Sequence, residues 1–245
     1  MKGIILAGGS GTRLRPLTLI TSKQLLPIYD KPMVFYPLYT LLRAGIKEIL
    51  VIVAPDRAGD FLRVLGSGKE FGAKFTYEIQ DKPNGLAEAF LIGADFIDDG
   101  PVTLILGDNL FIGRDDEISQ AIRTFEAGGR VFAKEVPDPS RFGVVEFDSQ
   151  GRVVSIEEKP NQPKSNFALV GLYVFDHRVV DITRHLQPSD RGELEITDIQ
   201  KAYLRLGQLD VQTYHGQWLD TGTFESLLAA GQLVALQKQK GESKK

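Results

Sequence analysis

Apolar segments of strand length alternate with segments of helical periodicity along most of this chain. In the first part, the expected strands occupy residues 4–6, 48–53, 74–80, 102–106 and 130–136. Helical patterns separate most of them, and a strand followed by a helix and then another strand favours parallel pairing. The alternation therefore predicts an α/β fold with a mixed, mainly parallel sheet covered by helices on both faces.

The second part of the chain adds antiparallel structure to this pattern. Residues 144–147 and 153–157, joined by a polar turn that ends in Gly151, are typical of a small hairpin. Further strands are expected at residues 169–175 and 209–214. We therefore predict that a small antiparallel hairpin is added to the parallel core.

Helical periodicity with start and stop signals defines the remaining elements. Pro32 can open the first helix, and Gly45 ends it. The other helices are expected near residues 61–65, 86–96, 118–125, 176–186, 195–206 and 224–237. Residues 218–223 are expected to form a loop, and residues 238–245, which include four lysines, a flexible tail.

Composition narrows the class of protein. A chain of 245 residues that is 42% hydrophobic and 25% charged can bury one large core. Its net charge of −3 argues against a nucleic-acid partner, and the absence of cysteine excludes disulfides, zinc–thiolate sites and a cysteine nucleophile. No leader precedes the first strand and no apolar run reaches the length of a membrane span, so we expect a cytoplasmic protein without membrane contact.

A glycine-rich loop, LAGGSGTRL at residues 6–14, follows the first strand. Its three glycines let backbone N–H groups approach a ligand closely, and the guanidinium of Arg13 matches phosphate oxygens. The loop is no P-loop, because Thr12 and Arg13 follow Gly11. A dinucleotide-binding loop would need a glycine at Leu14 and a nearer second strand. A polyphosphate-binding loop is favoured, and a tight turn without a ligand stays open.

Two charged residues stand at the ends of expected strands. Asp108 directly follows the most apolar strand, and ligands of open α/β sheets bind beyond the carboxyl ends of strands. A carboxylate that caps the next turn is the alternative. Lys159 precedes Pro160, which favours an extended backbone at the lysine.

Together these segments resemble the sugar-nucleotide pyrophosphorylases, a family of nucleotidyltransferases. The glycine-rich loop with Pro16, Thr18, Lys23 and Pro27 is similar to the family signature. Six motifs resemble, more narrowly, the glucose-1-phosphate thymidylyltransferases: KQLLP at 23–27, LGDN at 106–109, FGVVEF at 142–147, EEKP at 157–160, RGELEITD at 191–198 and WLDTGT at 218–223. The resemblance covers residues 2–235, and ordered motifs over this length are far more specific than any one alone.

The resemblance implies a Rossmann-like fold of the nucleotide-diphospho-sugar transferase type and a single displacement. A sugar 1-phosphate attacks the α-phosphorus of a nucleoside triphosphate in line, and pyrophosphate leaves. The implied substrates are dTTP and glucose 1-phosphate, and the implied product, dTDP-glucose, enters dTDP-rhamnose or related deoxysugar synthesis. Arg13 and Lys23 would act on the triphosphate and Lys159 on the sugar phosphate, while Asp108 and Asp220 would coordinate Mg²⁺.

The resemblance also implies two groups of binding residues. The nucleotide-binding group consists of Leu6, Gly8, Gly9, Ser10, Gly11, Thr12, Arg13, Lys23, Gln24, Gln80, Pro83, Gly85 and Asp108. The sugar-phosphate-binding group consists of Asn109, Gly143, Glu158, Lys159, Val170, Tyr173 and Arg191. Tyr173 and Trp218 also fit a core role, because each lies beside apolar strand residues.

The implied organisation is a single domain over residues 1–237. Its nucleotide-binding part would occupy about residues 1–136 and its sugar-binding part about residues 137–237. The resemblance implies a homo-oligomer, a tetramer in the family. The apolar face of the closing helix, with Leu227 and Leu228, could equally pack within one monomer.

Two features depart from the family pattern, and two other functions stay open. Longer members continue through a C-terminal helical segment that helps form a regulatory nucleotide site, so we expect weak feedback control here. Phe142 stands where a tyrosine is frequent.

Uridylyl or cytidylyl transfer to another sugar 1-phosphate is one alternative function, because base and sugar choice depend on few contacts. A non-catalytic nucleotide-sugar sensor is the other, although it should have lost one of the phosphate or metal groups.

Overall fold

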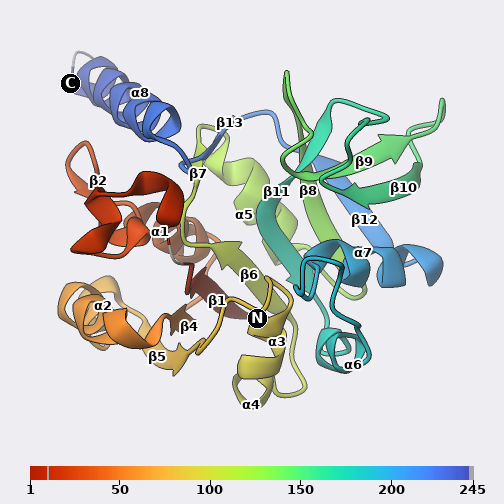
Figure 1. Cartoon of the computed structure of the whole chain (residues 1–245), viewed down its shortest axis with the longest axis horizontal. Helices are drawn as coiled ribbons and strands as arrows, with labels where there is room; N and C mark the ends of the chain where they lie inside the picture. The colour runs from red at the N-terminus through yellow and green to blue at the C-terminus, as the bar shows by residue number, and fades with distance from the viewer. Residues whose placement is uncertain (10, 243–245) are drawn as a thin grey trace.

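The computed structural model describes residues 1–9 and 11–242, and its centre is one mixed β-sheet (Figure 1). The strand order is β10-β9-β11-β6-β1-β4-β5, with β8 beside β11 and β12 beside β8. These strands are β1 (Lys2–Ala7), β4 (Glu48–Val53), β5 (Lys74–Ile79), β6 (Val102–Leu106), β8 (Gly129–Glu135), β9 (Gly143–Phe147), β10 (Val153–Glu158), β11 (Phe167–Phe175) and β12 (Leu209–Thr213).

Parallel pairing dominates the first half of the sheet, as the alternating pattern predicts. β1 lies between β4 and β6 and pairs in parallel with both, so that Ile5 stands beside Val51 and Ile105. β4 also pairs in parallel with β5. The predicted hairpin is confirmed as β9–β10, and β11 runs antiparallel to β6, β8 and β9. The strand β11 therefore makes the sheet mixed.

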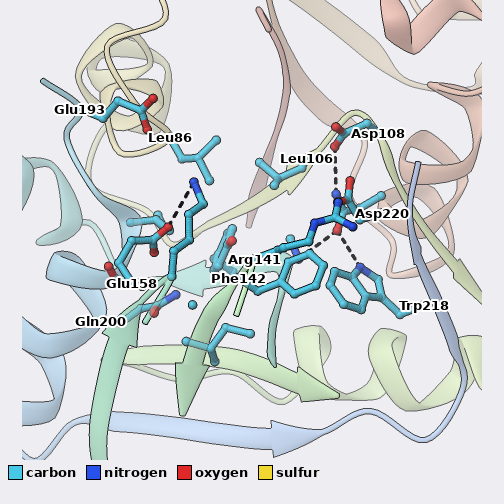
Figure 2. A pocket seen from close by; sticks show the side chains of 18 of the residues that line it. Leu86, Leu106, Asp108, Arg141, Phe142, Glu158, Glu193, Gln200, Trp218 and Asp220 are labelled. Carbon is cyan, nitrogen blue, oxygen red and sulfur yellow. Dashed lines mark hydrogen bonds and ion pairs between the residues drawn. The ribbon is translucent and has the colours of Figure 1, made fainter. Parts of the chain in front are cut away.

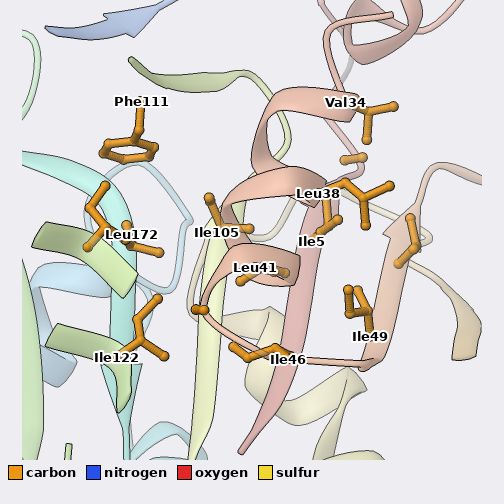
Figure 3. Packing of buried hydrophobic residues seen from close by; sticks show 14 of the residues in the cluster. Ile5, Val34, Leu38, Leu41, Ile46, Ile49, Ile105, Phe111, Ile122 and Leu172 are labelled. Atoms are coloured by element: carbon orange, nitrogen blue, oxygen red, sulfur yellow. The ribbon is translucent and has the colours of Figure 1, made fainter. Parts of the chain in front are cut away.

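Helices cover both faces of the sheet, because successive residues of its central strands are apolar on both sides. They are α1 (Phe35–Arg43), α2 (Ala58–Leu65), α3 (Glu88–Ile92), α4 (Ala94–Ile97), α5 (Asp115–Arg123), α6 (Val179–Arg184) and α7 (Ile196–Arg205). Ile5 of β1 packs in one cluster with Leu38 and Leu41 of α1 (Figure 3). Ile4 belongs to the cluster on the opposite face, which also contains Tyr203 of α7. Across the described part of the chain, no helix combines the length and apolar character that a membrane crossing requires.

Two expected elements differ from the structure. The loop expected at residues 218–223 is partly a strand, β13 (Gln217–Asp220), which pairs antiparallel with β7 (Asn109–Ile112). The helix expected at residues 86–96 is divided into α3 and α4 at Gly93. A Cβ at Gly93 would lie 3.1 Å from side-chain atoms of both Ile4 and Leu50, so glycine permits close packing on the sheet but interrupts the helix.

The closing helix α8 (Phe224–Glu242) extends beyond its expected end at residue 237. Residues 238–242, which we expected to fray, are therefore helical, and Lys238 forms an ion pair with Asp30. Residues 243–245 lie outside the described residues. Ala230 belongs to a small third cluster that also contains Ile28 of the short strand β2 (Pro27–Ile28), which pairs with β3 (Lys31–Pro32). Leu227 packs against this cluster, whereas Leu228 is exposed.

Candidate active site

The parallel strands β1 and β6 end at the same edge of the sheet, and the cleft lies at this edge. The glycine-rich loop follows β1, and Gly107 and Asp108 follow β6, as expected for a ligand site in an open α/β sheet. Three adjoining cavities of about 570, 180 and 300 Å³ lie here. Asp108 and Glu193 line all three, so the cavities form one continuous cleft.

The predicted residues divide among these cavities. The largest cavity is lined by Arg13, Asp108, Asn109, Gly143, Glu158, Lys159, Tyr173 and Asp220 (Figure 2). The second is lined by Leu6, Gly9, Gln24, Gln80, Pro83, Gly85 and Asp108, and the third by Gly9, Gly11, Thr12, Arg13, Lys23, Gln24, Pro83 and Asp108. The expected nucleotide group thus surrounds the two smaller cavities, and most of the expected sugar group surrounds the largest.

Lys23, Asp108 and Asp220 form the centre of the cleft. The ammonium of Lys23 donates a hydrogen bond to Asp108 and lies 3.9 Å from Oδ1 of Asp220. Lys23 comes from a 3₁₀ turn after the glycine-rich loop, and its side chain is 7% exposed. Thr221 donates its hydroxyl to the backbone oxygen of Asp108 at 2.8 Å, which ties the end of β13 to the end of β6. Residues distant in sequence are thereby held around one lysine.

The two carboxyl groups have shifted pKa values of opposite sign. Burial acts to raise the pKa of Asp108, but its ion pair and hydrogen bond with Lys23 hold that pKa below its usual value. Burial and the negative charge of Asp108 raise the pKa of Asp220, against the opposing effects of Lys23 and Arg13. The two carboxyl groups therefore stand close enough to repel each other, and Lys23 and Arg13 offset part of this repulsion.

Asn109 connects the cleft to the sheet through its amide. Its Nδ2 donates to Asp108 Oδ1 at 2.9 Å, while its Oδ1 accepts from the Gly171 amide at 3.1 Å and from Trp218 Nε1 at 2.7 Å. A Cβ at Gly171 would lie 2.6 Å from Oδ1 of Asn109, so this close approach requires glycine. Trp218 is therefore anchored by its indole N–H and also lines the largest cavity.

Glu158 and Lys159 stand on the opposite side of the largest cavity. Lys159 Nζ lies 3.6 Å from Glu158 Oε1, and burial raises the pKa of Glu158 although Lys159 opposes it. The backbone of Lys159 is not extended as Pro160 suggested, because its φ is +41°. Its amide donates to the oxygen of Phe142 at 3.0 Å, and this bond at the end of the hairpin overrides the local preference.

The remaining predicted sugar residues lie around this side of the cleft. Arg191 pairs with both oxygens of Glu195 at 2.8 Å and with Glu158 at 3.5 Å, and so touches a residue that lines the cavity. Tyr173 is 4% exposed and lines the cavity, so it is both a core residue and part of the cavity wall. Val170 is fully buried in the hydrophobic core, next to Gly171, which lines the cavity.

The second cavity, lined by expected nucleotide-binding residues, contains two buried glutamines whose amides form hydrogen bonds. Gln80 donates through Nε2 to Glu88 at 2.8 Å, and a Cβ at Gly8 would lie 2.4 Å from its Oε1. Gln24 accepts from Ser22 Oγ at 2.7 Å. Gly85 has a φ of +114° and would clash with Leu194 if it carried a Cβ. Ser10 lies outside the described residues.

Comparison with known proteins decides the family. The nucleotidyl transferase family profile matches residues 2–237. A glucose-1-phosphate thymidylyltransferase of Mycolicibacterium smegmatis is 55% identical over 96% of this chain and 82% of the relative. The chain belongs to the nucleotidyl transferase family. The resemblance found in the motifs is thus confirmed.

Solved structures agree with this assignment. A putative glucose-1-phosphate thymidylyltransferase from Bacillus anthracis, in complex with a sucrose, matches with a TM-score of 0.89 and 42% identity over 95% of this chain and 94% of that one. A UDP-glucose pyrophosphorylase complexed with UDP-glucose matches with a TM-score of 0.85 and 24% identity over 96% and 98% of the two chains. The second likeness supports the fold alone, and the predicted fold class is confirmed.

Nucleotidyl transferases generally use a divalent metal ion, and the carboxylates of this cleft fit one. Asp108 and Asp220 supply hard oxygen donors, and their mutual repulsion would be relieved by added positive charge. In residues 1–9 and 11–242, no group of three or more His, Cys, Asp or Glu side chains is arranged to hold a metal. Phosphate oxygens and water would therefore have to complete the coordination sphere.

In this nucleotidyl transferase, several residues that line the largest cavity were not among the predicted site residues, including Arg141, Glu193 and Gln200. Arg141 pairs with Asp220 at 3.4 Å, and its guanidinium carbon lies 5.6 Å from the ring centre of Phe142. Glu193 lies at the junction of all three cavities, and Gln200 lines the cavity from α7. The signal for Gln200 was present, because a polar residue on the buried face of a helix indicates a special role.

Proposed function

We propose that the protein transfers a thymidylyl group from dTTP to glucose 1-phosphate, giving dTDP-glucose and pyrophosphate. The observation that carries the proposal is the cluster of Lys23, Asp108 and Asp220 between the glycine-rich loop and the cavity containing Glu158 and Lys159. The thymidylyltransferase activity named for relatives at about half identity supports the choice of substrates.

In this proposal, Arg13 and Lys23 bind the triphosphate. Both line the cavity next to the glycine-rich loop, where backbone N–H groups of Gly9 and Gly11 can also reach phosphate oxygens. Lys23 is buried, so its charge acts through little water and is effective against the charge that develops at the phosphates. These residues would stabilise the transition state and the leaving pyrophosphate.

Lys159 binds the sugar phosphate from the opposite side. Lys159 lines the largest cavity, and its ammonium lies 3.6 Å from Glu158 Oε1. Glu158, Gly143 and Tyr173 line the same cavity and would contact sugar hydroxyl groups. A phosphate monoester is already an anion at neutral pH, so the attack requires no general base from the protein.

Gln24, Gln80 and Gly85 bind the base in the second cavity. Hydrogen bonds to Ser22 and Glu88 fix the two glutamine amides, whose donors and acceptors can match the carbonyl and imide edge of thymine. Uracil offers the same edge and lacks only a methyl group, so uridylyl transfer is the second candidate activity.

Asp108 and Asp220 would hold Mg²⁺, which supplies charge compensation to phosphate oxygens when bound.

The proposed binding of the two substrates divides the chain into two parts of one domain over residues 1–237. The nucleotide-binding part occupies about residues 1–136 and the sugar-binding part about residues 137–237. We further propose a homo-oligomer. Light scattering should give at least twice the chain mass of 27.1 kDa, and a mass equal to that of one chain would contradict this assembly.

The function is tested by pyrophosphate release over a matrix of four triphosphates against several hexose 1-phosphates. We expect the highest kcat/KM for dTTP with glucose 1-phosphate and a smaller value for UTP, by up to about 100-fold. A strong preference for CTP or for another sugar would replace these substrates. No turnover with any pair, together with tight binding of dTDP-glucose, would favour the sensor.

A further inference from the structure

Gln200 is buried in the wall of the largest cavity without a protein partner. Its side chain is 0% exposed, and both its Oε1 and its Nε2 lack a hydrogen-bond partner among the residues that the structure describes. A buried amide without partners is costly, by about 1–3 kcal/mol per unsatisfied group. Native structures keep few such groups, and each one requires an explanation, such as a molecule in the adjoining cavity that completes its hydrogen bonds.

The helix α7 presents Gln200 beside other polar groups. Thr197 stands three residues earlier, on the same helix face, and also lines the cavity. Close packing surrounds this face, because a Cβ at Gly143 would lie 2.9 Å from the Thr197 methyl carbon and 3.6 Å from Glu158 Oε2. Gly143, Thr197 and Glu158 are therefore closely packed in the wall that Gln200 also lines.

The position of Gln200 in the cleft indicates the chemistry of its missing hydrogen-bond partner. In Figure 2, Gln200 lies on the side of Glu158, away from Asp108, Asp220 and Trp218. A neutral amide cannot compensate a phosphate charge, whereas its acceptor and donors match hydroxyl groups, which both donate and accept. The complementary ligand group is therefore a hydroxyl of the sugar.

We propose that Gln200 determines sugar specificity by hydrogen bonding to one hydroxyl, or to two adjacent hydroxyls, of the hexosyl substrate. This inference rests on the proposed function, because it assigns the sugar to the largest cavity. Glu158 and Lys159 then hold the sugar from the hairpin, and Gln200 contacts it from α7. A sugar that lacks the matched hydroxyl would leave the amide unpaired, so discrimination should be strong at that position only.

The test compares the wild-type protein with Gln200→Met, which has similar length and no amide. For each protein, kcat/KM is measured with glucose 1-phosphate and its 2-, 3-, 4- and 6-deoxy analogues. In the wild type, we expect one analogue, or two adjacent ones, to lose about 5-fold to 100-fold. Gln200→Met should lose a similar factor on glucose 1-phosphate and no longer distinguish that analogue from it.

Three controls separate the outcomes. Gln120→Met, an exposed position on α5, should leave all five values unchanged. The Kd for dTTP should be the same in all variants. If Gln200→Met is too unstable to assay, Gln200→Asn replaces it; this variant keeps an amide at shorter reach and should retain part of the discrimination between sugars. An equal loss on every sugar, or an unchanged pattern, would overturn the role of Gln200. Absence of wild-type turnover with glucose 1-phosphate would instead overturn the proposed function.

Discussion

Asp108 and Asp220 share one lysine at the point where the two halves of the cleft meet. One of these carboxyl groups follows a central strand of the sheet, and the other ends a short strand from the far end of the chain. Lys23 contacts both, and burial together with the charge of Asp108 raises the pKa of Asp220, which Lys23, Arg13 and Arg141 oppose. The two carboxylates supply the hard oxygen donors of the proposed metal site.

The charges of Asp108 and Asp220 can be removed one at a time. Asp108→Asn and Asp220→Asn should each reduce kcat by about 100-fold or more, because each removes one anionic oxygen donor from the proposed metal site. Asp210→Asn, on β12 and 46% exposed, is the matched control and should retain activity. Steady-state rates over a Mg²⁺ titration provide the measurement, and wild-type rates in both cleft variants would remove the metal assignment.

The second residue-scale prediction concerns Lys159. Lys159→Ala should raise the KM for glucose 1-phosphate by about 10-fold to 100-fold, because it removes a charged donor from the sugar phosphate. The Kd for dTTP, measured by calorimetry without the sugar, should change little. Lys47→Ala, an exposed lysine, serves as control. If the affinity for dTTP fell as much as that for glucose 1-phosphate, Lys159 would belong to the triphosphate instead.

The sequence predicted the site residues that stand in recognisable motifs. It did not predict those that reach the cleft only through the three-dimensional fold. Asp108 and Lys23 stand in short motifs after recognisable strands, and the structure brings them together. Arg141 reaches Asp220 through a long side chain from a loop, which no periodicity marks. The positive φ of Lys159 arises from a hydrogen bond across the hairpin, which a local preference cannot reveal.

At the scale of elements, Asp176 fastens the end of β11 to two neighbouring elements. Its carboxylate accepts from the Gly128 amide at 2.8 Å, from the Tyr203 hydroxyl of α7 at 2.8 Å and from Arg178. The group is 7% exposed, so little water can replace these donors. Helix α7, which carries Gln200, therefore depends on Asp176 for its place against the sheet.

We predict that Asp176→Ala lowers the free energy of unfolding by about 2–4 kcal/mol, because it leaves buried donors without an acceptor. Asp181→Ala is the matched control, since that side chain is 73% exposed, and its effect should stay within about 0.5 kcal/mol. Urea denaturation measures both. Equal stability of the two variants would show that the cluster contributes nothing to the fold.

The same carboxyl group should make stability depend on pH. Burial acts to raise the pKa of Asp176, but hydrogen bonds from Arg178, Gly128 and Tyr203 hold it below its usual value. A pKa that is lower in the folded state gives stability that is present above the unfolded value and lost as the pH falls through the folded one. The difference in unfolding free energy between wild type and Asp176→Ala should therefore shrink below about pH 4. A constant difference from pH 7 to pH 3 would contradict this.

Elements that were predicted correctly are long and strongly patterned, whereas the missed ones are short. β7 and β13 pair over only four positions, and the motif at residues 218–223 shows no alternation that marks a strand. Their pairing is nevertheless what brings Asp220 beside Asn109. The cleft thus depends on elements below the length at which a sequence pattern is informative.

At the scale of the whole molecule, one sheet supports both halves of the cleft. The parallel strands β1 and β6 lead into the glycine-rich loop and Asp108, and the hairpin β9–β10 carries Glu158 (Figure 1). The direction of β11, which joins the two regions, could not be predicted because a fully buried strand is apolar on both faces whichever way it runs. Sequence therefore predicted the layers but not this antiparallel junction.

In the proposed reaction, both substrates are bound at once and the phosphate of glucose 1-phosphate attacks the α-phosphorus of dTTP directly. One in-line displacement inverts the configuration at phosphorus, whereas two successive displacements through a covalent enzyme intermediate retain it. The most direct measurement is the configuration of the dTDP-glucose analogue formed from one stereoisomer of dTTP that carries sulfur on its α-phosphorus, read by phosphorus NMR. Inversion is the predicted result, and retention of configuration would contradict direct transfer between two substrates held in one cleft.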